Sequence, residues 1–272
     1  MSKNKRVILI TGGAGGLGVA TGNKLKDYKI VVADYSDEIV NNAVEDYTKN
    51  GFEAVGFTSD ITSKDDVTKL IEFTKAQGPF GGLVHTAGVS ETVNDVDKVF
   101  NINLKGTALI VDAVYDISEE GSSIVLFSSM MGHTVPANKK YDEALRNPLE
   151  TNSLNTVKEF VKNDSSLMYN STKRGVQLIV EDIVMRFGKK GSRINSISPG
   201  VIMTKMGLKA AEEHPEIINN LLKMTALNRT GEADDIADVV KFLVSNDSRF
   251  ITGTDLLVDG GVLPSIKKQA QS

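Results

Sequence analysis

Residues 5–18 read KRVILITGGAGGLG, an apolar run followed by five glycines within seven residues. The run Val7–Ile10 has the composition of a buried strand, and a helix is expected after Gly18. Glycines permit a tight turn and a close approach to a ligand, and a helix start offers free N–H groups and a positive dipole end to phosphate. The spacing fits two fingerprints, Gly13-x-Gly15-x-x-Gly18 and Gly12-x-x-x-Gly16-x-Gly18. A flexible turn would also be glycine-rich, but a strand before it and a helix after it favour a dinucleotide site.

The same alternation of strand and helix patterns continues to the end of the chain. Short Val- and Ile-rich runs are separated by stretches of helical length, as in a parallel sheet covered on both faces. Helices are expected at residues 151–161 and, as one or two helices, at 203–227. We therefore expect an α/β protein with a doubly wound Rossmann fold, whose mostly parallel seven-stranded sheet carries helices on both faces within one domain, residues 1–272. The predicted strands are Val7–Ile10, Ile30–Ala33, Ala54–Phe57, Leu83–Thr86, Ile124–Phe127, Arg193–Ile197 and Leu256–Val258.

Composition excludes several classes of function. The 272 residues include no Cys, so disulfides, thiolate metal sites and Cys nucleophiles are excluded, and a cytoplasmic location is expected. The net charge is −4 with both signs interspersed, which gives no basic face for nucleic acid. No run approaches 18 apolar residues, so no membrane span is expected. The three histidines, His85, His133 and His214, show no metal-ligand spacing, and no metal is expected.

Asp34 follows the second predicted strand, 22 residues after Gly12. The dinucleotide fingerprint has an acid about 20 residues after its glycines, where the carboxylate accepts hydrogen bonds from the adenosine ribose. A carboxylate there would repel a 2′-phosphate, and neither Tyr35 nor Ser36 supplies a compensating cation. The pattern favours NAD(H) over NADP(H), although Asp34 could instead cap the following helix.

Tyr169 and Lys173 lie four residues apart in YNSTK, so on a helix they share one face. At about 5 Å and an effective dielectric near 20, the ammonium would favour the phenolate by roughly 3 kcal/mol, or about two pKa units. A phenol made acidic in this way could act in general acid–base catalysis. The pair by itself is also what a surface helix would show by chance, so its meaning depends on the rest of the chain.

From about residue 5 to 262 the chain resembles the classical short-chain dehydrogenase/reductase family. TGGAGGLG is similar to that family's cofactor loop, TSDIT to its adenine-contact segment, and HTAG at residues 85–88 to its NNAG segment. NINLKG resembles the segment that carries the catalytic asparagine, and VLFSSMMG resembles the strand-five segment that carries the catalytic serine. YNSTK, NSISPGVIMT and FITGTDLLVDGG resemble the tyrosine–lysine, nicotinamide-flanking and last-strand segments. The matches occur in the family's order.

The resemblance implies four catalytic residues. Tyr169 would exchange a proton with the substrate oxygen, and Ser129 would hydrogen-bond the same oxygen. Lys173 would lower the tyrosine pKa and hold the nicotinamide ribose, and Asn103 would position a water between Lys173 and solvent. The cofactor would carry the hydride. The implied cofactor contacts are Gly12, Gly15, Gly16, Leu17, Gly18, Asp34, Tyr35, Asp60, Ile61, Ala87, Gly88, Tyr169, Lys173, Pro199, Gly200, Ile202 and Thr204.

The sequence departs from the family pattern in three places. His85 and Thr86 replace an asparagine pair that bridges backbone groups; threonine can do part of this, and His85 is expected to be a packed strand residue. Only 15 residues separate Gly88 from Asn103, so one pocket wall should be reduced. Ser129 and Tyr169 are 40 residues apart instead of roughly a dozen, so residues 137–165 form an insertion, either a lid or a subunit contact. These features, with LRNPLE at 145–150, resemble the 3α-hydroxysteroid dehydrogenase/carbonyl reductase branch.

Four methionines adjoin the implied catalytic residues in the sequence and suit an irregular apolar pocket, although methionine is also ordinary core filler. These methionines are Met130, Met131, Met203 and Met206. They favour a hydrophobic substrate such as a hydroxysteroid. The expected function is an NAD(H)-dependent oxidoreductase that interconverts a secondary alcohol and a ketone. The alternatives are a 3-oxoacyl-thioester reductase and a non-catalytic NAD-binding redox sensor. The expected partners are the small-molecule substrate and further copies of the chain in a dimer or tetramer.

Overall fold

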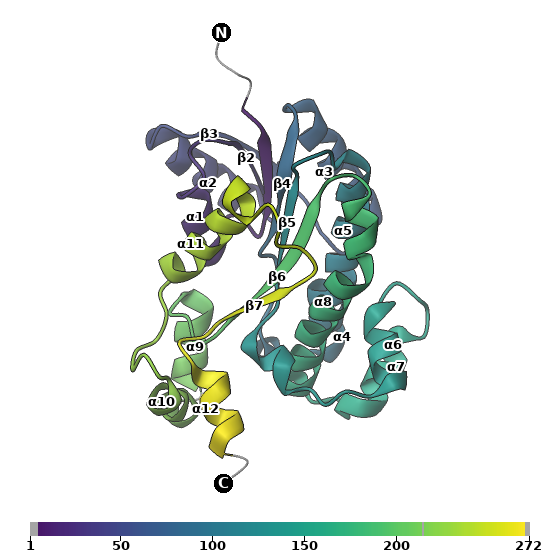
Figure 1. Ribbon diagram of the computed structural model, residues 1–272, viewed down its shortest axis with the longest axis vertical. Coiled ribbons are helices and arrows are strands. Elements are labelled where there is room, and N and C mark those ends of the chain that lie inside the picture. The colour runs from purple at the N-terminus through teal and green to yellow at the C-terminus, as the bar shows by residue number, and fades with distance from the viewer. Residues whose placement is uncertain (1–4, 214, 270–272) are drawn as a thin grey trace.

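The central sheet has seven strands in the order β3-β2-β1-β4-β5-β6-β7, and every neighbouring pair is parallel (Figure 1). The computed structural model describes residues 5–213 and 215–269. The predicted doubly wound fold is confirmed, and the expected Leu83–Thr86 strand begins earlier and ends one residue sooner. The strands are β1 (Val7–Thr11), β2 (Lys29–Asp34), β3 (Glu53–Thr58), β4 (Phe80–His85), β5 (Ser123–Phe127), β6 (Arg193–Pro199) and β7 (Asp255–Val258).

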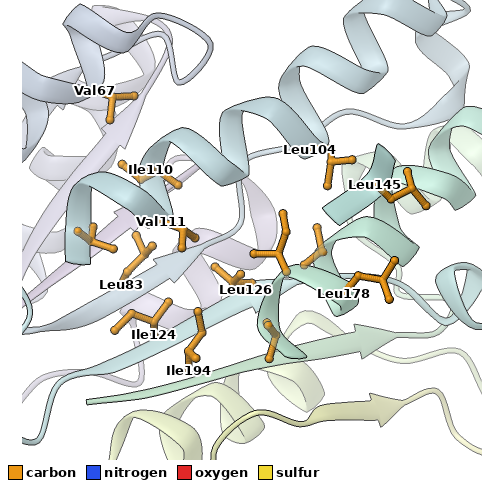
Figure 2. Packing of buried hydrophobic residues seen from close by; sticks show 14 of the residues in the cluster. Val67, Leu83, Leu104, Ile110, Val111, Ile124, Leu126, Leu145, Leu178 and Ile194 are labelled. Carbon is orange, nitrogen blue, oxygen red and sulfur yellow. The ribbon is translucent and has the colours of Figure 1, made fainter. Parts of the chain in front are cut away.

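Helices cover both faces of the sheet, because alternate strand residues point to opposite sides. Val7 and Leu9 belong to one buried cluster, and Ile8 and Ile10 belong to the other. Full burial of such a side chain contributes about 1.5–3 kcal/mol. Figure 2 shows part of the first cluster, which contains side chains from α3, α5 and α8. The first face carries α3 (Lys64–Ala76), α4 (Val96–Phe100), α5 (Thr107–Ile117) and α8 (Ser165–Gly188), and the second carries α1 (Gly16–Gly22), α2 (Asp37–Lys49) and α11 (Ala233–Val244).

The segment at 137–165 forms two helices outside α8 (Figure 1). The expected helix at 151–161 is confirmed as α7 (Ser153–Val161), whereas α6 (Lys139–Arg146) was not predicted. Its charged residues surround a narrow buried stripe that includes Tyr141 and Leu145. Leu145 joins the first core cluster, and the Tyr141 hydroxyl is hydrogen-bonded to Ser171 of α8. The segment is therefore packed onto the helix layer.

The remaining helices lie near the carboxyl ends of the strands. The expectation of one or two helices over 203–227 is confirmed by α9 (Lys205–Glu213) and α10 (Pro215–Met224), and α12 (Val262–Gln269) follows the last strand. Among the described residues, no helix has the length and apolar character needed to cross a membrane. The short helical turns are η1 (Glu91–Val93), η2 (Asn101–Gly106), η3 (Met130–Thr134) and η4 (Asn246–Ser248), of which η2 is π-helical.

Strand order reverses direction between β1 and β4, since the chain runs outward from β1 to β3 and then returns to β4. Loops that leave these two strands diverge, and open α/β sheets bind ligands in the crevice that results. The glycine-rich loop follows β1, and the loop of residues 86–90 follows β4. The fold therefore places the predicted dinucleotide loop at the switch point.

Candidate active site

The glycine-rich loop turns tightly between β1 and α1. Gly12 has a φ of +68°, and a Cβ added to it would lie 2.6 Å from the Ala87 nitrogen. A Cβ on Gly18 would lie 2.4 Å from the Gly12 oxygen, so neither position has room for a side chain. The N-cap of α1 is Gly15, no side chain caps the helix, and its first turn holds no acid. The free N–H groups at this helix start fit a diphosphate.

Asp34 lies at the end of β2, beside this loop. Its carboxylate accepts a hydrogen bond from the Ala14 nitrogen at 3.2 Å and one from the Tyr35 nitrogen at 2.9 Å. Ser36 is the N-cap of α2, so the alternative in which Asp34 caps that helix is wrong. Tyr35 is 78% exposed. The remaining lone pairs of the carboxylate are available to ribose hydroxyls next to the glycine loop.

The TSDIT segment is held next to Asp34, because the Ser59 nitrogen donates to the Asp34 oxygen at 2.9 Å. Asp60 is exposed and accepts the Thr62 nitrogen at 2.8 Å, whereas Ile61 is buried against η2. The structure thus brings the implied adenine-side residues together, though Ile61 contributes to the core as well.

The implied nicotinamide-side segment follows β6. Pro199 ends that strand, and the Gly200 nitrogen donates to the Val258 oxygen at 2.9 Å. Ile202 forms an isolated bridge with Gly231. A Cβ on Gly16 would lie 3.3 Å from Thr204, so this segment contacts the glycine loop directly. The two ends of the implied cofactor site are therefore parts of one edge of the sheet, and Leu17 and Ala87 lie along the same edge.

Tyr169 and Lys173 both project from α8, and the Lys173 Nζ lies 5.6 Å from the centre of the Tyr169 ring. Ser129 follows β5 by two residues, and its side chain lies close enough to Tyr169 to lower the pKa of that phenol. Asn103 lies in η2, next to Gly88. A Cβ on Gly88 would lie 3.1 Å from Asn103 Oδ1 and 3.7 Å from Lys173 Nζ. The structure thus gathers all four residues that the resemblance implied.

The pKa of Tyr169 differs in direction from the expectation. Burial raises the pKa of Tyr169 to about 12, the nearby Glu91 carboxylate raises it further, and the hydrogen bond from Ser129 opposes the increase. The same burial lowers the pKa of Lys173 to about 8. The expected lowering of the Tyr169 pKa is therefore wrong in this structure, where loss of hydration is the largest cause of the shift. The phenol is protonated at neutral pH.

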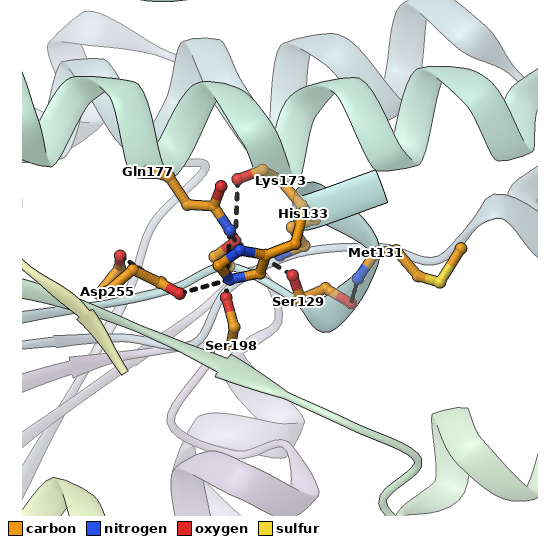
Figure 3. A network of polar contacts seen from close by, with 9 residues as sticks. Ser129, Met131, His133, Lys173, Gln177, Ser198 and Asp255 are labelled. Carbon is orange, nitrogen blue, oxygen red and sulfur yellow. Dashed lines mark hydrogen bonds and ion pairs between the residues drawn. The ribbon is translucent and has the colours of Figure 1, made fainter. Parts of the chain in front are cut away.

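Ser129 begins a short turn that is fixed at both ends (Figure 3). Its Oγ accepts a hydrogen bond from the Met131 nitrogen at 3.2 Å and caps η3. At the other end of η3, His133 Nε2 lies 2.8 Å from Asp255 Oδ2 on β7. The turn that carries Ser129 is therefore tied to the edge of the sheet.

A second polar network fixes α8 to the strand ends (Figure 3). Ser128 Oγ donates to the Lys173 oxygen at 2.9 Å, and Gln177 Nε2 donates to Ser128 Oγ at 3.1 Å and to Ser198 Oγ at 3.2 Å. All four residues are buried. No sequence pattern pointed to Ser128, Gln177 and Ser198, whose only signal was a polar residue within an otherwise buried run. They orient the helix that carries Tyr169 and Lys173.

The two substituted residues after β4 behave largely as expected. Thr86 Oγ1 donates to the Thr11 oxygen at 2.8 Å and to the Gly12 oxygen at 3.0 Å, which confirms a bridging role. His85 is 2% exposed, and burial lowers its pKa to about 3. The prediction that it is a packed strand residue is confirmed. His214 lies outside the described residues. In the part of the chain that the structure describes, no group of three or more acids, histidines or cysteines could hold a metal ion.

The methionines that were expected to line a substrate pocket differ in exposure. Met130 is buried in η3, whereas Met203 and Met206 are 36% and 44% exposed. A cavity of about 460 Å³ lies beside the first turn of α8, and none of these methionines lines it. Its lining is polar and includes three carboxylates; it consists of Glu91, Thr92, Asn94, Asn163, Asp164, Ser165, Ser166 and Glu213. The assignment of these methionines to a substrate pocket therefore stays a prediction.

Comparison with known proteins agrees with the geometry. Residues 6–142 match the family model described as short chain dehydrogenase, and residues 150–263 match one described as Enoyl-(Acyl carrier protein) reductase. The short-chain dehydrogenase/reductase bsc3 of Alternaria brassicicola is 30% identical, with 100% of both chains covered. The 7alpha-hydroxysteroid dehydrogenase of Bacteroides fragilis is 28% identical over 94% of each chain.

A comparison with solved structures also finds a similar oxidoreductase. The crystal structure of levodione reductase has a TM-score of 0.75 and 26% identity to this chain, and the match covers 95% of this chain and 98% of that one. The family match thus extends over both halves of the chain, and it includes the glycine loop and the helix that carries Tyr169 and Lys173. The chain belongs to the short-chain dehydrogenase/reductase family of oxidoreductases.

Proposed function

We propose that the protein is an NAD(H)-dependent oxidoreductase that interconverts a secondary alcohol and a ketone. The observation that carries this proposal is the placement of Lys173 Nζ 5.6 Å from the centre of the Tyr169 ring, with Ser129 beside that phenol and the glycine loop at the same sheet edge. A bound nicotinamide would supply the hydride donor or acceptor.

Residues of the protein would transfer the proton and hydrogen-bond the substrate oxygen. In the reducing direction, Tyr169 donates its phenolic proton to the carbonyl oxygen as the hydride arrives at carbon. The Ser129 hydroxyl donates a hydrogen bond to the same oxygen and orients it. The Lys173 ammonium then stabilises the phenolate that remains and offers hydrogen bonds to the nicotinamide ribose. Oxidation of the alcohol uses the same steps in reverse.

Asp34 supports NAD(H) as the cofactor, since its carboxylate lies where ribose hydroxyls would bind. We expect Asp34→Ala to narrow the preference for NAD(H) over NADP(H) by about tenfold or more, which corresponds to about 1.4 kcal/mol. The change removes the repulsion between the carboxylate and a 2′-phosphate. Steady-state kinetics with each cofactor give the ratio of kcat/KM values that tests this.

Asp46→Ala is the matched control for this charge change, because Asp46 is an exposed acid on α2. The control should keep the preference of the wild type. A wild type that prefers NADPH, or an Asp34→Ala variant with an unchanged ratio, would refute the assignment.

The substrate proposal is a ketone or secondary alcohol with a hydrophobic body, such as a hydroxysteroid. Support comes from two relatives, named 7alpha-hydroxysteroid dehydrogenase and levodione reductase, and from the exposed Met203 and Met206 near the implied nicotinamide segment. Carboxylates line the polar cavity beside α8, so a substrate that extends into this cavity would carry hydrogen-bond donors at its far end. We further propose that the enzyme is a homo-oligomer.

A substrate panel tests the reaction class. Steroid ketones and alcohols, small diols and acyl thioesters are offered with NAD(H) or NADP(H), and the absorbance of the reduced cofactor is followed. We expect turnover with a ketone or secondary alcohol and NAD(H). Activity confined to acyl thioesters with NADPH would favour a 3-oxoacyl-thioester reductase. Tight NADH binding without turnover of any compound would favour a redox sensor.

A further inference from the structure

Four buried residues form a continuous chain of hydrogen bonds between the end of β1 and the π-helical turn. Thr11 Oγ1 lies 2.6 Å from His85 Nδ1, and His85 Nε2 lies 2.9 Å from Thr107 Oγ1. Thr107 Oγ1 donates to the Asn103 oxygen at 2.7 Å. Each member is almost completely withdrawn from water. This series of hydrogen bonds begins one residue before the glycine loop and ends on the implied catalytic asparagine.

The direction of every hydrogen bond in this chain is determined by its last acceptor. A carbonyl oxygen can only accept, so the single proton of the Thr107 hydroxyl points to Asn103. Thr107 must then accept from His85, which places a proton on His85 Nε2. Burial and the Lys173 charge lower the pKa of His85, so the ring is neutral and Nδ1 accepts from the Thr11 hydroxyl. Only one tautomer of His85 satisfies all three contacts.

Asn103 is the residue that this chain fixes. Its side chain makes two 2.8 Å hydrogen bonds to Val89: the Val89 nitrogen donates to Oδ1, and Nδ2 donates to the Val89 oxygen. Asn103 lies in the π-helical turn η2, where the Thr107 hydroxyl supplies its carbonyl with a donor. Gly88 packs against both Asn103 Oδ1 and Lys173 Nζ. A rotation of Asn103 would therefore move the 88–89 backbone relative to Lys173.

We propose that His85 is a positioning residue that acts through Thr107 to fix Asn103, and with it the loop at 88–89, against Lys173. The chain departs from its family at residue 85, and the imidazole there spans a distance between two threonine hydroxyls with one donor and one acceptor. The neutral ring joins the two hydroxyls without placing a second positive charge beside Lys173. The kinetic consequence rests on the proposed function, whereas the tautomer does not.

The tautomer can be measured directly in the intact protein. Long-range ¹H–¹⁵N correlation spectra of the uniformly labelled chain report the ring nitrogens of its three histidines, and the His85 signals are assigned by their loss in His85→Gln. We expect a neutral ring protonated at Nε2, unchanged as pH is varied across the neutral range. A ring protonated at Nδ1, or one that titrates near its ordinary pKa, would overturn the proposal.

A pair of substitutions tests the effect on turnover. Thr107→Val keeps the shape and removes the hydroxyl, so kcat should fall about tenfold while the Kd for NADH changes less than about twofold. Thr107→Ser keeps the hydroxyl and should retain kcat within about twofold. A purely structural role would lower Tm in both variants without this difference in kcat between them. An unchanged kcat in Thr107→Val, or an equal loss in Thr107→Ser, would contradict the proposal.

His85 itself supplies the second comparison, should Thr107→Val fail to fold. His85→Gln retains a donor and an acceptor and should keep more of kcat than His85→Leu, which retains neither. Equal kcat in these two variants would count against the proposal. A wild type without any turnover would refute the proposed function alone, because the tautomer measurement still decides whether the hydrogen-bond chain exists.

Discussion

Tyr169→Phe should lower kcat by at least about 10³-fold, within the 10²–10⁴-fold range of general acid–base catalysis, while the Kd for NADH stays within about twofold. The substitution removes one oxygen atom and keeps the ring that packs against the first core cluster. With that oxygen gone, the phenolic proton that would go to the substrate oxygen is absent, and Ser129 loses its neighbouring hydroxyl. Turnover is followed by NADH absorbance, and binding by NADH fluorescence titration.

Tyr141→Phe is the matched control. Tyr141 lies 12 residues after Ser129, which is the family's usual spacing, but Leu145 stands where a lysine would follow. In the structure its hydroxyl contacts Ser171 and its ring stacks on Phe160, with centres 4.5 Å apart. We expect its turnover to stay within about threefold of wild type, since one neutral hydrogen bond contributes about 1 kcal/mol. Full turnover in Tyr169→Phe, or loss of turnover only in Tyr141→Phe, would refute the assignment of Tyr169 as the general acid and base.

The direction of the Tyr169 pKa shift predicts how the two reaction directions respond to pH. Burial holds the pKa of the phenol near 12, so Tyr169 carries its proton throughout the neutral range. Reduction needs that proton, whereas oxidation needs its absence. Ketone reduction should therefore be fast at neutral pH and alcohol oxidation should accelerate as pH rises. An oxidation rate that peaks below neutral pH would contradict a tyrosine base.

Sequence reasoning predicted the sheet well because burial on both faces leaves a clear pattern. Val7–Ile10 is apolar at every position, so the strand could be identified without its neighbours. The candidate site was predicted less from any single spacing than from the order of several motifs along the chain. Tyr169 and Lys173 alone had a chance explanation, and only Asn103 and Ser129 in the expected order gave them meaning.

What the sequence could not predict depends on tertiary contacts. The lysine charge was expected to dominate the pKa of Tyr169, but the amount of water removed from the phenol is a property of the packed site. Helix α6 was missed because its buried stripe is narrow and its other residues are charged. Gln177 and His85 gain their roles from partners on distant segments, which no local pattern reveals.

Lys173→Met should reduce kcat/KM by about 10²–10³-fold and at the same time stabilise the protein at neutral pH. The activity is lost because no charge remains beside the phenolate. The stability gain has a separate cause: burial lowers the pKa of Lys173 to about 8 from 10.5. At about 1.4 kcal/mol per pKa unit, this shift means that the buried ammonium costs about 3 kcal/mol at neutral pH.

The pH dependence of stability distinguishes this cost from other effects of the substitution. Between pH 8 and 10.5 the unfolded chain holds the Lys173 proton while the folded protein has released it, so the free energy of unfolding of the wild type rises with pH. Methionine does not titrate, so the advantage of Lys173→Met should be complete below pH 8 and disappear toward 10.5. Part of the gain is offset, because the Phe127 oxygen loses its 2.9 Å donor, at a cost of about 1–3 kcal/mol.

Lys140→Met controls for the loss of a lysine, since Lys140 lies on the surface and pairs with Glu159 at 2.8 Å. Such exposed pairs contribute about 0–1 kcal/mol, so the control should show neither a large change in Tm nor a pH-dependent difference from wild type. Thermal unfolding of the three proteins from pH 7 to 10.5 supplies the comparison. If Lys173→Met were less stable than wild type and followed the same pH curve, the ammonium would carry no desolvation cost, and the geometry that places it inside the site would be wrong. A stabilised but inactive variant would instead show that the protein retains an unfavourable buried charge because the reaction uses it.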